Sequence, residues 1–415
     1  MLHSLHLKNV GPAPEMRMKL ARRLNLITGD NGLGKSFLLD LAWWALTRTW
    51  ASLPAIPRGA GEATLGVQYE GQTKPHEYES RYDRRRQQWI GKKSGRPANP
   101  GMVIYARVDG GFAVWDPARA SEAGDAPGFV FDAEDVWDGL ARRCNGLVRD
   151  WATWQLEQKE AWRLLQNALQ VMSPSEDEPL RPGALTRVSL DDPRDIPTLR
   201  LPYGEVPILH ASAGMRRICA LVYLLVWTWI EHQRASKLID QPPTDRIIFL
   251  VDEPDTHLHP RWQRVVLRSL LNVVHQLMTK GDAKVQLIAA THSPLVMASV
   301  EPLFDPAHDK CWHLDADGEL VHLREEAWAK EGDVLGWLAS ATFGLKHARS
   351  LESEVAIEAA EAFMRDDLPA PQHLRTRAAI HAELVRLLAG SDPFWARWIA
   401  SQDRGPAARS PRRKR

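Results

Sequence analysis

A glycine-rich segment near the start of the chain carries the clearest chemistry. Residues 29–36 read GDNGLGKS and fit the pattern G-x-x-x-x-G-K-[ST] at every fixed position. Glycines let backbone N–H groups converge on phosphate oxygens, and a following helix N-terminus adds free donors. Lys35 would reach the β- and γ-phosphates and Ser36 would ligate Mg²⁺. We therefore expect a P-loop (Walker A) for ATP, with candidate residues Gly29, Asp30, Asn31, Gly32, Leu33, Gly34, Lys35, Ser36 and Phe37.

A pair of carboxylates ends an apolar run farther along the chain. Residues 247–251 are Ile-Ile-Phe-Leu-Val, and Asp252 and Glu253 follow. This is typical of a Walker B strand, in which Asp252 would hold Mg²⁺ and Glu253 would activate water. The alternative is an acidic pair that caps a helix, because Pro254 comes next. The P-loop upstream favours the catalytic interpretation.

Two further segments could contact phosphate. The apolar run 285–290 ends shortly before His292, and a ring at the carboxyl end of a parallel strand faces the crevice where ligands bind. Ser212 and Gly214 open the most apolar helix of the chain, where free N–H groups would form a second anion site. The simpler interpretation of Ser212 is an ordinary helix N-cap.

The elements needed to position these residues can be read from the same sequence. An apolar run at 24–28 predicts the strand before the P-loop, and 37–50 predicts the helix after it. Residues 62–116 indicate short strands, and 134–172 indicate helix from regularly spaced tryptophans. Residues 173–207 are rich in Pro, Asp and Glu and predict a linker. Further strands and helices are expected at 3–7, 16–20, 261–278, 295–300, 310–314, 319–323 and beyond 350.

Composition narrows the class of protein. The 415 residues have a net charge of +1, which gives no global argument for nucleic-acid binding. Three separated cysteines suit a reducing cytoplasm and form no zinc or disulfide framework. The first ten residues lack a signal-peptide pattern. The run at 218–230 is too short to span a bilayer, so we expect a buried helix and no membrane association.

The four motifs, in this order, resemble the ABC-class ATPase heads of the SMC, RecF and OLD group. The matching stretches are GDNGLGKS (29–36), SAGMRR (212–217), LVDEPDTHLHP (250–260) and ATHSP (290–294). The third and fourth are typical of the OLD/RecF-like branch, the AAA15 or AAA_21 ATPases. The resemblance implies an α/β fold: a P-loop head with a mixed central sheet, an antiparallel β subdomain, a helical insertion and a helical C-terminal tail.

The resemblance also implies a mechanism. Two heads would dimerise head to tail around ATP, so that Ser212 and Gly214 touch the γ-phosphate bound to the partner subunit. Asp255 would lie in the loop across the seam, and His292 would be the switch histidine. Two positions depart from the pattern. The signature reads Ser-Ala-Gly-Met-Arg, and the Q-loop residue stays open between Gln68, Gln87, Gln88 and the strand end at 105–107.

The resemblance further suggests a partner. We expect no nuclease in this chain, because Asp315 and Asp317 form the one D-x-D beyond residue 294 and lie in a hairpin-like setting. Stand-alone heads resemble ATPase subunits of Septu- or PARIS-like anti-phage systems, where a separate nuclease or effector acts. Two alternatives are an ATP-stabilised scaffold with negligible turnover and a RecF-like DNA-repair ATPase.

Four regions are expected, and the last contains two surface candidates. Aromatic residues at 394–398 either dock a partner or pack on their own core, and the basic tail 409–415 either contacts DNA or is a solvated terminus. His257 and His259 beside Asp255 shape a turn better than they form a metal site. The expected regions are 1–130 (P-loop and β subdomain), 131–207 (helical insertion and linker), 208–345 (signature, Walker B and switch histidine) and 346–415 (helical, with the basic tail).

Overall fold

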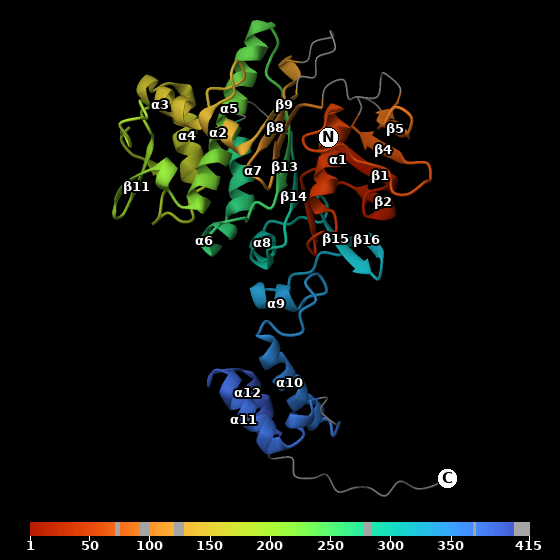
Figure 1. Cartoon of the computed structure of the whole chain (residues 1–415). Helices are drawn as coiled ribbons and strands as arrows, with labels where there is room; N and C mark the ends of the chain where they lie inside the picture. Colours follow the sequence, from red (N-terminus) through yellow and green to blue (C-terminus); the bar gives the residue numbers. More distant parts are fainter. Residues whose placement is uncertain (71–74, 92–99, 120–127, 278–283, 368–370, 402–415) are drawn as a thin grey trace, which may run out of the picture. The chain divides into compact units, whose positions relative to one another are not determined.

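The computed structural model describes the chain except for residues 71–74, 92–99, 120–127, 278–283, 368–370 and 402–415. The chain divides into two compact units, Met1–Trp337 and Leu338–Arg415 (Figure 1). The basic tail and most of the polar loop before Pro100 lie outside the described residues.

A mixed sheet of eight strands lies at the centre of the larger unit (Figure 1). Its strands are β3 (Leu24–Gly29), β7 (Met102–Ala106), β8 (Phe112–Trp115), β9 (Gly128–Phe131), β13 (Arg246–Asp252), β14 (Lys284–Ala290), β15 (Asp309–Asp317) and β16 (Leu320–Glu326). They lie in the order β16-β15-β3-β14-β13-β7-β8-β9, and the five from β15 to β7 run parallel. The inner strands are buried on both faces, which explains their unbroken apolar runs.

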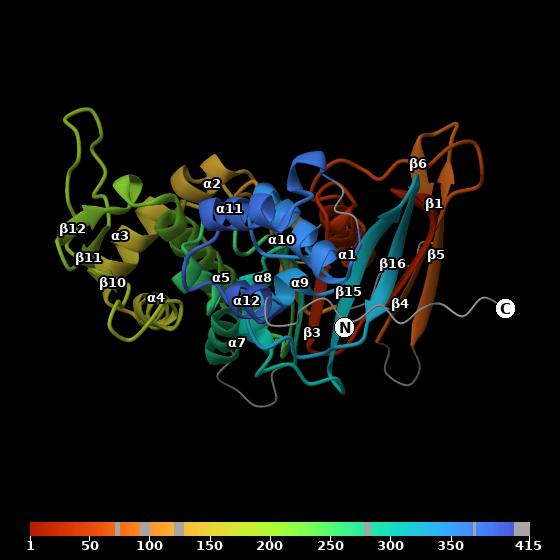
Figure 2. The same cartoon turned by 90° about the horizontal axis from the view of Figure 1, so that it is seen from below.

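A second sheet is antiparallel throughout. It contains β1 (Leu2–Val10), β2 (Ala13–Lys19), β4 (Thr64–Tyr69), β5 (His76–Asp83) and β6 (Gln88–Ile90), in the order β2-β1-β4-β5-β6. β16 contacts β2, so the two sheets meet at that edge (Figure 2). The predicted antiparallel β subdomain is thereby confirmed.

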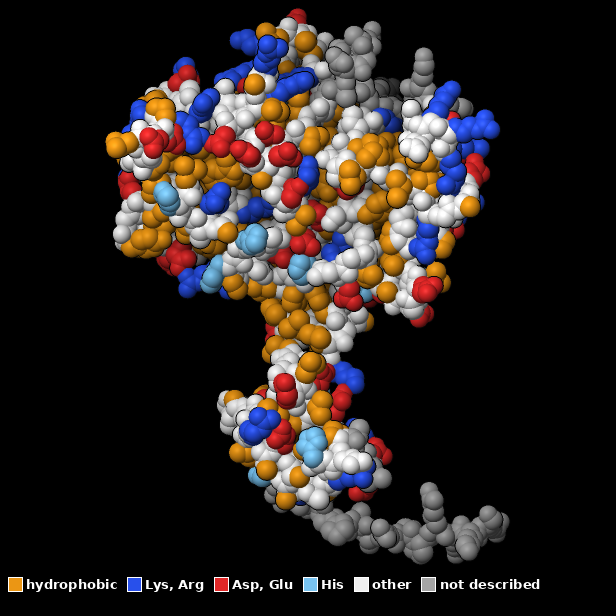
Figure 3. Space-filling model, viewed as in Figure 1, with side chains coloured by type: hydrophobic (Ala, Val, Ile, Leu, Met, Phe, Trp, Pro, Cys, Tyr) orange, Lys and Arg blue, Asp and Glu red, His pale blue; other side chains and the backbone are white. Residues whose placement is uncertain are grey.

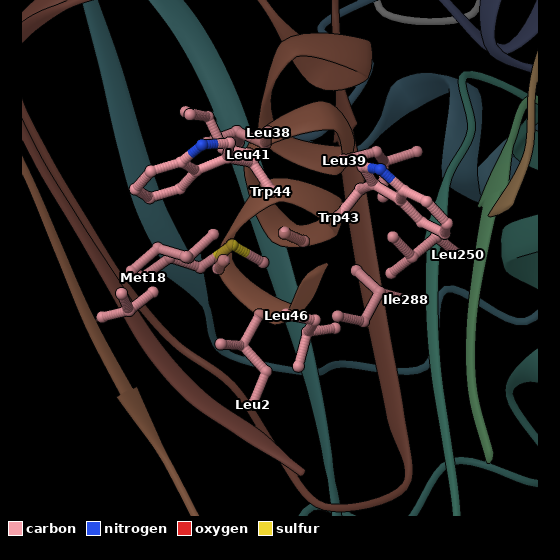
Figure 4. Packing of buried hydrophobic residues seen from close by; sticks show 14 of the residues in the cluster. Leu2, Met18, Leu38, Leu39, Leu41, Trp43, Trp44, Leu46, Leu250 and Ile288 are labelled. Atoms are coloured by element: carbon pink, nitrogen blue, oxygen red, sulfur yellow. The ribbon is translucent and has the colours of Figure 1, made fainter. Parts of the chain in front are cut away.

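Helix α1 (Lys35–Thr47) joins the cores of the two sheets. It begins two residues earlier than predicted, so that Lys35 and Ser36 form its first turn. Trp43 and Leu39 pack toward Leu250 of the mixed sheet, whereas Trp44 lies on the side of Met18 in β2 (Figure 4). A helix buried on all sides is apolar on all sides, and this is why the segment shows no polar face.

The helical insertion contains α2 (Ala133–Asp138), α3 (Leu147–Glu157) and α4 (Glu160–Val171). Trp151, Trp154 and Trp162 are buried, as their spacing predicted. α4 packs on α5 (Ala213–Leu238), the long helix that opens with Ser212. With 26 residues and a mean hydropathy of 1.3, α5 is long and apolar enough to cross a membrane, but 83% of that apolar window is buried within the protein.

The linker predicted at 173–207 contains regular structure that the sequence did not reveal. Strands β10 (Arg181–Pro182), β11 (Thr198–Leu201) and β12 (Gly204–Pro207) form a small antiparallel sheet. Thr198 and Leu199 of β11 are buried. Strands of two to four residues are too short to show an alternating pattern, so only backbone pairing identifies them.

The helix predicted at 261–278 is divided in two. α6 (Pro260–Gln263) ends where the Val265 N–H bonds to the Trp262 carbonyl at 3.0 Å, and α7 (Val266–Leu277) then begins. Two short helices follow, α8 (Pro294–Val300) and α9 (Val334–Ala339). Among the described residues, single 3₁₀ turns occur at Pro117–Arg119, Ile208–His210 and Gln372–Leu374.

The smaller unit has its own helical core. It contains α10 (Leu351–Met364), α11 (Arg377–Leu387) and α12 (Phe394–Ala400). Phe394 and Trp398 are buried in this core, and the Trp398 indole donates to His381 Nδ1 at 3.1 Å. Of the two interpretations of this aromatic group, packing on its own core is therefore the one that the structure supports.

Candidate functional site

The predicted motifs meet at the carboxyl edge of the parallel strands. Asp252 at the end of β13 pairs with Ala290 at the end of β14, which in turn pairs with Ile27 of β3. On the other side of β13, Val251 pairs with Ala106. The P-loop, the Walker B carboxylates and the segment with His292 therefore leave the sheet at neighbouring positions.

Two glycines shape the P-loop. Gly29 has φ 134°, and an added Cβ would lie 2.2 Å from the Leu314 carbonyl oxygen, so only glycine fits there. Gly34 has φ 103° and caps α1, and its carbonyl accepts the Leu38 N–H at 3.1 Å. The loop therefore ends in a helix N-terminus with free N–H groups, as phosphate binding requires.

Lys35 is held by its own loop. Its Nζ donates to the Gly29 carbonyl at 2.8 Å and to the Asp30 carbonyl at 3.0 Å. The side chain is only 6% exposed, and burial lowers its pKa, while the nearby carboxylates of Glu253 and Asp252 act in the opposite direction. An ammonium in this position is ready to exchange carbonyl partners for phosphate oxygens.

Asp252 has the environment of a metal ligand. The residue is 1% exposed, and its Oδ1 has no hydrogen-bond partner among the described residues. Burial raises its pKa to about 6, against the effect of a hydrogen bond from Ser36. A buried carboxylate oxygen without a partner, beside a serine hydroxyl, fits Mg²⁺, which prefers oxygen ligands.

Glu253 lies beside the predicted switch histidine. Its carboxylate is 3.3 Å from His292 Nδ1, and the Thr256 hydroxyl donates to it at 3.2 Å. Its backbone has φ 46°, and its N–H bonds to the Ala290 carbonyl at 2.9 Å. A non-glycine residue in the left-handed region turns its side chain away from the strand direction, which here brings it to His292. Thr256 was not predicted, because a threonine after Walker B has no distinctive pattern.

A buried side chain holds the loop after Walker B in place. Asp255 is 7% exposed and accepts the Thr291 hydroxyl at 2.6 Å, so its side chain ties this loop to the strand end before His292. Burial raises the pKa of Asp255. His259 caps α6 by accepting the Arg261 N–H at 3.3 Å. Its side chain therefore shapes the turn, in line with the prediction.

The signature segment leads into α5. Ser212 is the N-cap, with its hydroxyl accepting the Met215 N–H at 3.3 Å, as the simpler interpretation predicted. Gly214 is buried, and a Cβ on it would lie 2.8 Å from the His257 carbonyl oxygen. The start of α5 therefore contacts the loop after Walker B, which explains the need for glycine.

The structure separates the candidates for the Q-loop. Gln68 and Gln88 lie in β4 and β6, and Gln87 lies in the turn between β5 and β6, all within the antiparallel sheet. Residues 105–107 instead end β7, next to Walker B. Here the Arg107 carbonyl accepts Nη2 of Arg217 from α5 at 2.8 Å. Arg217 was not predicted, and nothing in its sequence context indicates this contact.

A comparison with protein families matches part of the chain. Residues 159–298 match the AAA_21 model, described as "AAA domain, putative AbiEii toxin, Type IV TA system". The match includes the signature, Walker B and the histidine segment, and it begins well after the P-loop at residues 29–36. It confirms the resemblance to AAA_21 ATPases that the motifs suggested.

A curated relative and two solved structures also show similarity to the chain, with low sequence identity or over a short stretch. The "Retron Vc95 probable ATPase" of Vibrio cholerae serotype O1 biovar El Tor is 31% identical over 97 residues, which cover 23% of this chain and 17% of the relative. The SMC head domain from Thermotoga maritima has 14% identity and a TM-score of 0.40, covering 79% of this chain and 99% of that one. A RecF structure, described as RecF-ATPrS, has 11% identity and a TM-score of 0.41, covering 79% and 98%.

The family match and the arrangement of the motifs agree. The segment that matches the AAA domain supplies one side of the site, and the P-loop outside that segment supplies the other. The chain therefore contains a segment similar to the AAA_21 domain at residues 159–298, together with a P-loop sequence at residues 29–36.

Proposed function

We propose that the protein binds Mg-ATP and hydrolyses it. One observation carries the proposal: the Glu253 carboxylate lies beside His292 at the same sheet edge as Lys35 and Asp252. Together these residues supply a base, a phosphate contact and a metal ligand. The family match supports the proposal, since that family is described as an AAA domain.

Each side chain has a defined task in this proposal. Lys35 and the N–H groups of the P-loop hold the phosphates, and Asp252 with Ser36 holds Mg²⁺. The metal ion would neutralise charge on the β- and γ-phosphate oxygens. Glu253 takes a proton from the attacking water, and Thr256 fixes its carboxylate through the hydrogen bond at 3.2 Å. His292 contacts the γ-phosphate and responds to its loss.

We further propose that two heads close around ATP. Ser212 is exposed at the N-terminus of α5, so its hydroxyl and the adjacent N–H groups are available to a nucleotide on a second subunit. The buried contact of Gly214 with the loop after Walker B links this surface to the catalytic edge. ATP would then favour a closed dimer and hydrolysis would reopen it.

The output of this cycle is the regulation of a separate nuclease or effector in anti-phage defence, in the cytoplasm. The similarity to a retron ATPase supports this proposal, although it covers only part of either chain. DNA is a second candidate ligand, in view of the RecF-like motifs.

The deciding experiment measures ATP turnover by purified protein with Mg²⁺, with and without double-stranded DNA, beside Glu253→Gln. Turnover that the substitution abolishes supports the proposal, and DNA stimulation would favour the RecF-like role. Turnover equal in both proteins would refute Glu253 as the base. Negligible wild-type turnover, with ATP-dependent dimers in light scattering, would support the scaffold instead.

A further inference from the structure

A groove of about 920 Å³ lies on the larger unit, away from the residues assigned above. One wall is formed by Arg261 of α6, Arg264 at the break after α6, and Arg268 of α7. The opposite wall comes from α8, including Leu295 and Ala298, both half-buried. Positively charged and apolar side chains thus face one another across a concave surface.

The arginines differ in their partners. Arg261 forms an ion pair with Glu178, from the acidic segment before β10. Arg264 and Arg268 are exposed, and neither side chain has an ion pair or hydrogen bond to any residue in the part of the chain that the structure describes. Glu178 therefore shows that a carboxylate can pair with an arginine of this wall. Arg264 at the helix break and Arg268 in α7 remain available for a ligand.

The carboxylates of the groove argue against nucleic acid. Asp177, Glu178 and Asp333 also line it. A phosphate backbone carries charge at every step and would be repelled by these groups. A protein segment has separate charges that can face Arg264 and Arg268 and apolar side chains that can cover Leu295. Figure 3 shows charges of both signs interspersed over one face of the molecule, with no continuous basic field there.

The helices that line the groove follow closely after the candidate catalytic residues in the chain. α6 begins seven residues after Glu253, and α8 begins two residues after His292. The Ser293 hydroxyl donates to Gln263 Oε1 at 2.9 Å, which joins the last residue of α6 to the N-cap of α8. A segment bound between these helices would therefore respond to movement of the two loops that contact the γ-phosphate.

We propose that this groove binds a segment of a partner protein that carries two acidic side chains and an apolar face. The proposal names the chemistry of the partner in the proposed function and rests on that function only for the coupling to ATP. Acidic side chains would pair with Arg264 and Arg268, and apolar side chains would pack against α8.

The test uses fluorescein-labelled helical peptides and the full-length protein without nucleotide. The first peptide has glutamates at i and i+4 on one face and leucines on the other; the second has glutamines in place of the glutamates. We expect the acidic peptide to bind in fluorescence anisotropy, and the double variant Arg264→Glu/Arg268→Glu to bind it at least about tenfold more weakly. Arg163→Glu, an exposed arginine of α4, is the control and should bind as the wild type does.

A peptide of opposite charge distinguishes a loss of charge pairing from a loss of folding in the double variant. A peptide with lysines in place of the glutamates should bind the double variant better than the wild type. Equal binding of acidic and glutamine peptides, or of wild type and double variant, would overturn the proposal. The proposal would also fail if the double variant lost ATP-dependent dimerisation but bound the peptide as the wild type does. The groove would then bind a second copy of this chain. ATP turnover is measured separately, so failure of the ATPase would not be mistaken for failure of the groove.

Discussion

The carboxylate of Glu253 lies 3.3 Å from Nδ1 of His292, although the two residues follow different strands of the sheet. The parallel pairing of β13 with β14 brings the two strand ends together, and the left-handed backbone at Glu253 turns its side chain toward the ring. This pair places a candidate base and a candidate phosphate sensor within contact of each other.

Glu253→Gln should abolish turnover while keeping ATP bound. The amide has nearly the same shape but cannot accept a proton from water, and general-base catalysis typically contributes about 10²–10⁴-fold. We expect the rate of phosphate release to fall by at least about 100-fold, with ATP affinity within about threefold of wild type. An unchanged rate of phosphate release would mean that another group is the base.

Lys35→Ala should weaken nucleotide binding. The substitution removes the ammonium that now bonds to the carbonyls of Gly29 and Asp30 and would contact phosphate. We expect ATP affinity, measured by calorimetry with Mg²⁺, to fall by about tenfold or more. Lys19→Ala, at an exposed position of β2, is the control. If both variants bound ATP equally well, the P-loop assignment would have to be withdrawn.

Asp252→Asn should separate metal binding from nucleotide binding. The buried Oδ1 without a partner would lose its charge while the side chain keeps its size. ATP affinity in excess Mg²⁺ should fall toward the value in EDTA by about tenfold, because a neutral amide is a poor Mg²⁺ ligand. In EDTA the two proteins should bind ATP alike. A variant that kept the full Mg²⁺ effect would exclude Asp252 as a ligand.

Gln286→Leu should destabilise the larger unit without touching the site. This buried side chain in β14 accepts the Leu2 N–H at 2.9 Å and donates to the carbonyls of Leu2 and Ala21 at 2.8 and 2.7 Å. Leucine would leave three buried backbone groups without this partner, at a cost of about 3 kcal/mol or more. Thermal unfolding should show a clearly lower Tm, whereas the exposed control Gln276→Leu should leave the Tm within about a degree. Equal Tm values for Gln286→Leu and the wild type would show that the three hydrogen bonds of Gln286 do not stabilise the larger unit.

Trp398→Ala should affect the smaller unit alone. Trp398 is fully buried among α10, α11 and α12, so its removal should cost about 3–5 kcal/mol. We expect the protease resistance of this unit to fall while ATP binding by the larger unit persists. Trp395→Ala, at a half-buried position of the same helix, should cost less. Loss of ATP binding in Trp398→Ala would show that the two units depend on each other.

Much of the site was readable from sequence because its residues fall in fixed local patterns. The P-loop, Asp252 with Glu253 and the segment with His292 each combine an apolar strand with polar residues at its end, and periodicity reveals such strands. The expected fold class was confirmed for the same reason. The α6–α7 break and the small sheet at β10–β12 were missed, because a few backbone hydrogen bonds decide them.

Contacts between distant segments were beyond the reach of local patterns. The bonds from Gln286 to Leu2, from Thr291 to Asp255 and from Arg217 to Arg107 join segments that only the folded chain brings together. The same holds for Glu253, whose position beside His292 depends on a backbone conformation that its residue type does not favour.

Proline stands in the first turn of both helices that flank the groove, Pro260 in α6 and Pro294 in α8. A proline ring fixes φ near −65°, which suits the first helical residue, and it disfavours helical backbone in the residue before it, so the loop does not readily extend the helix. Displacement of either nucleotide-contacting loop would then move the start of the helix that follows it, without adding a residue to that helix. The distance between the starts of α6 and α8 would then depend on whether the γ-phosphate is present, and this dependence would reach a surface that binds no nucleotide.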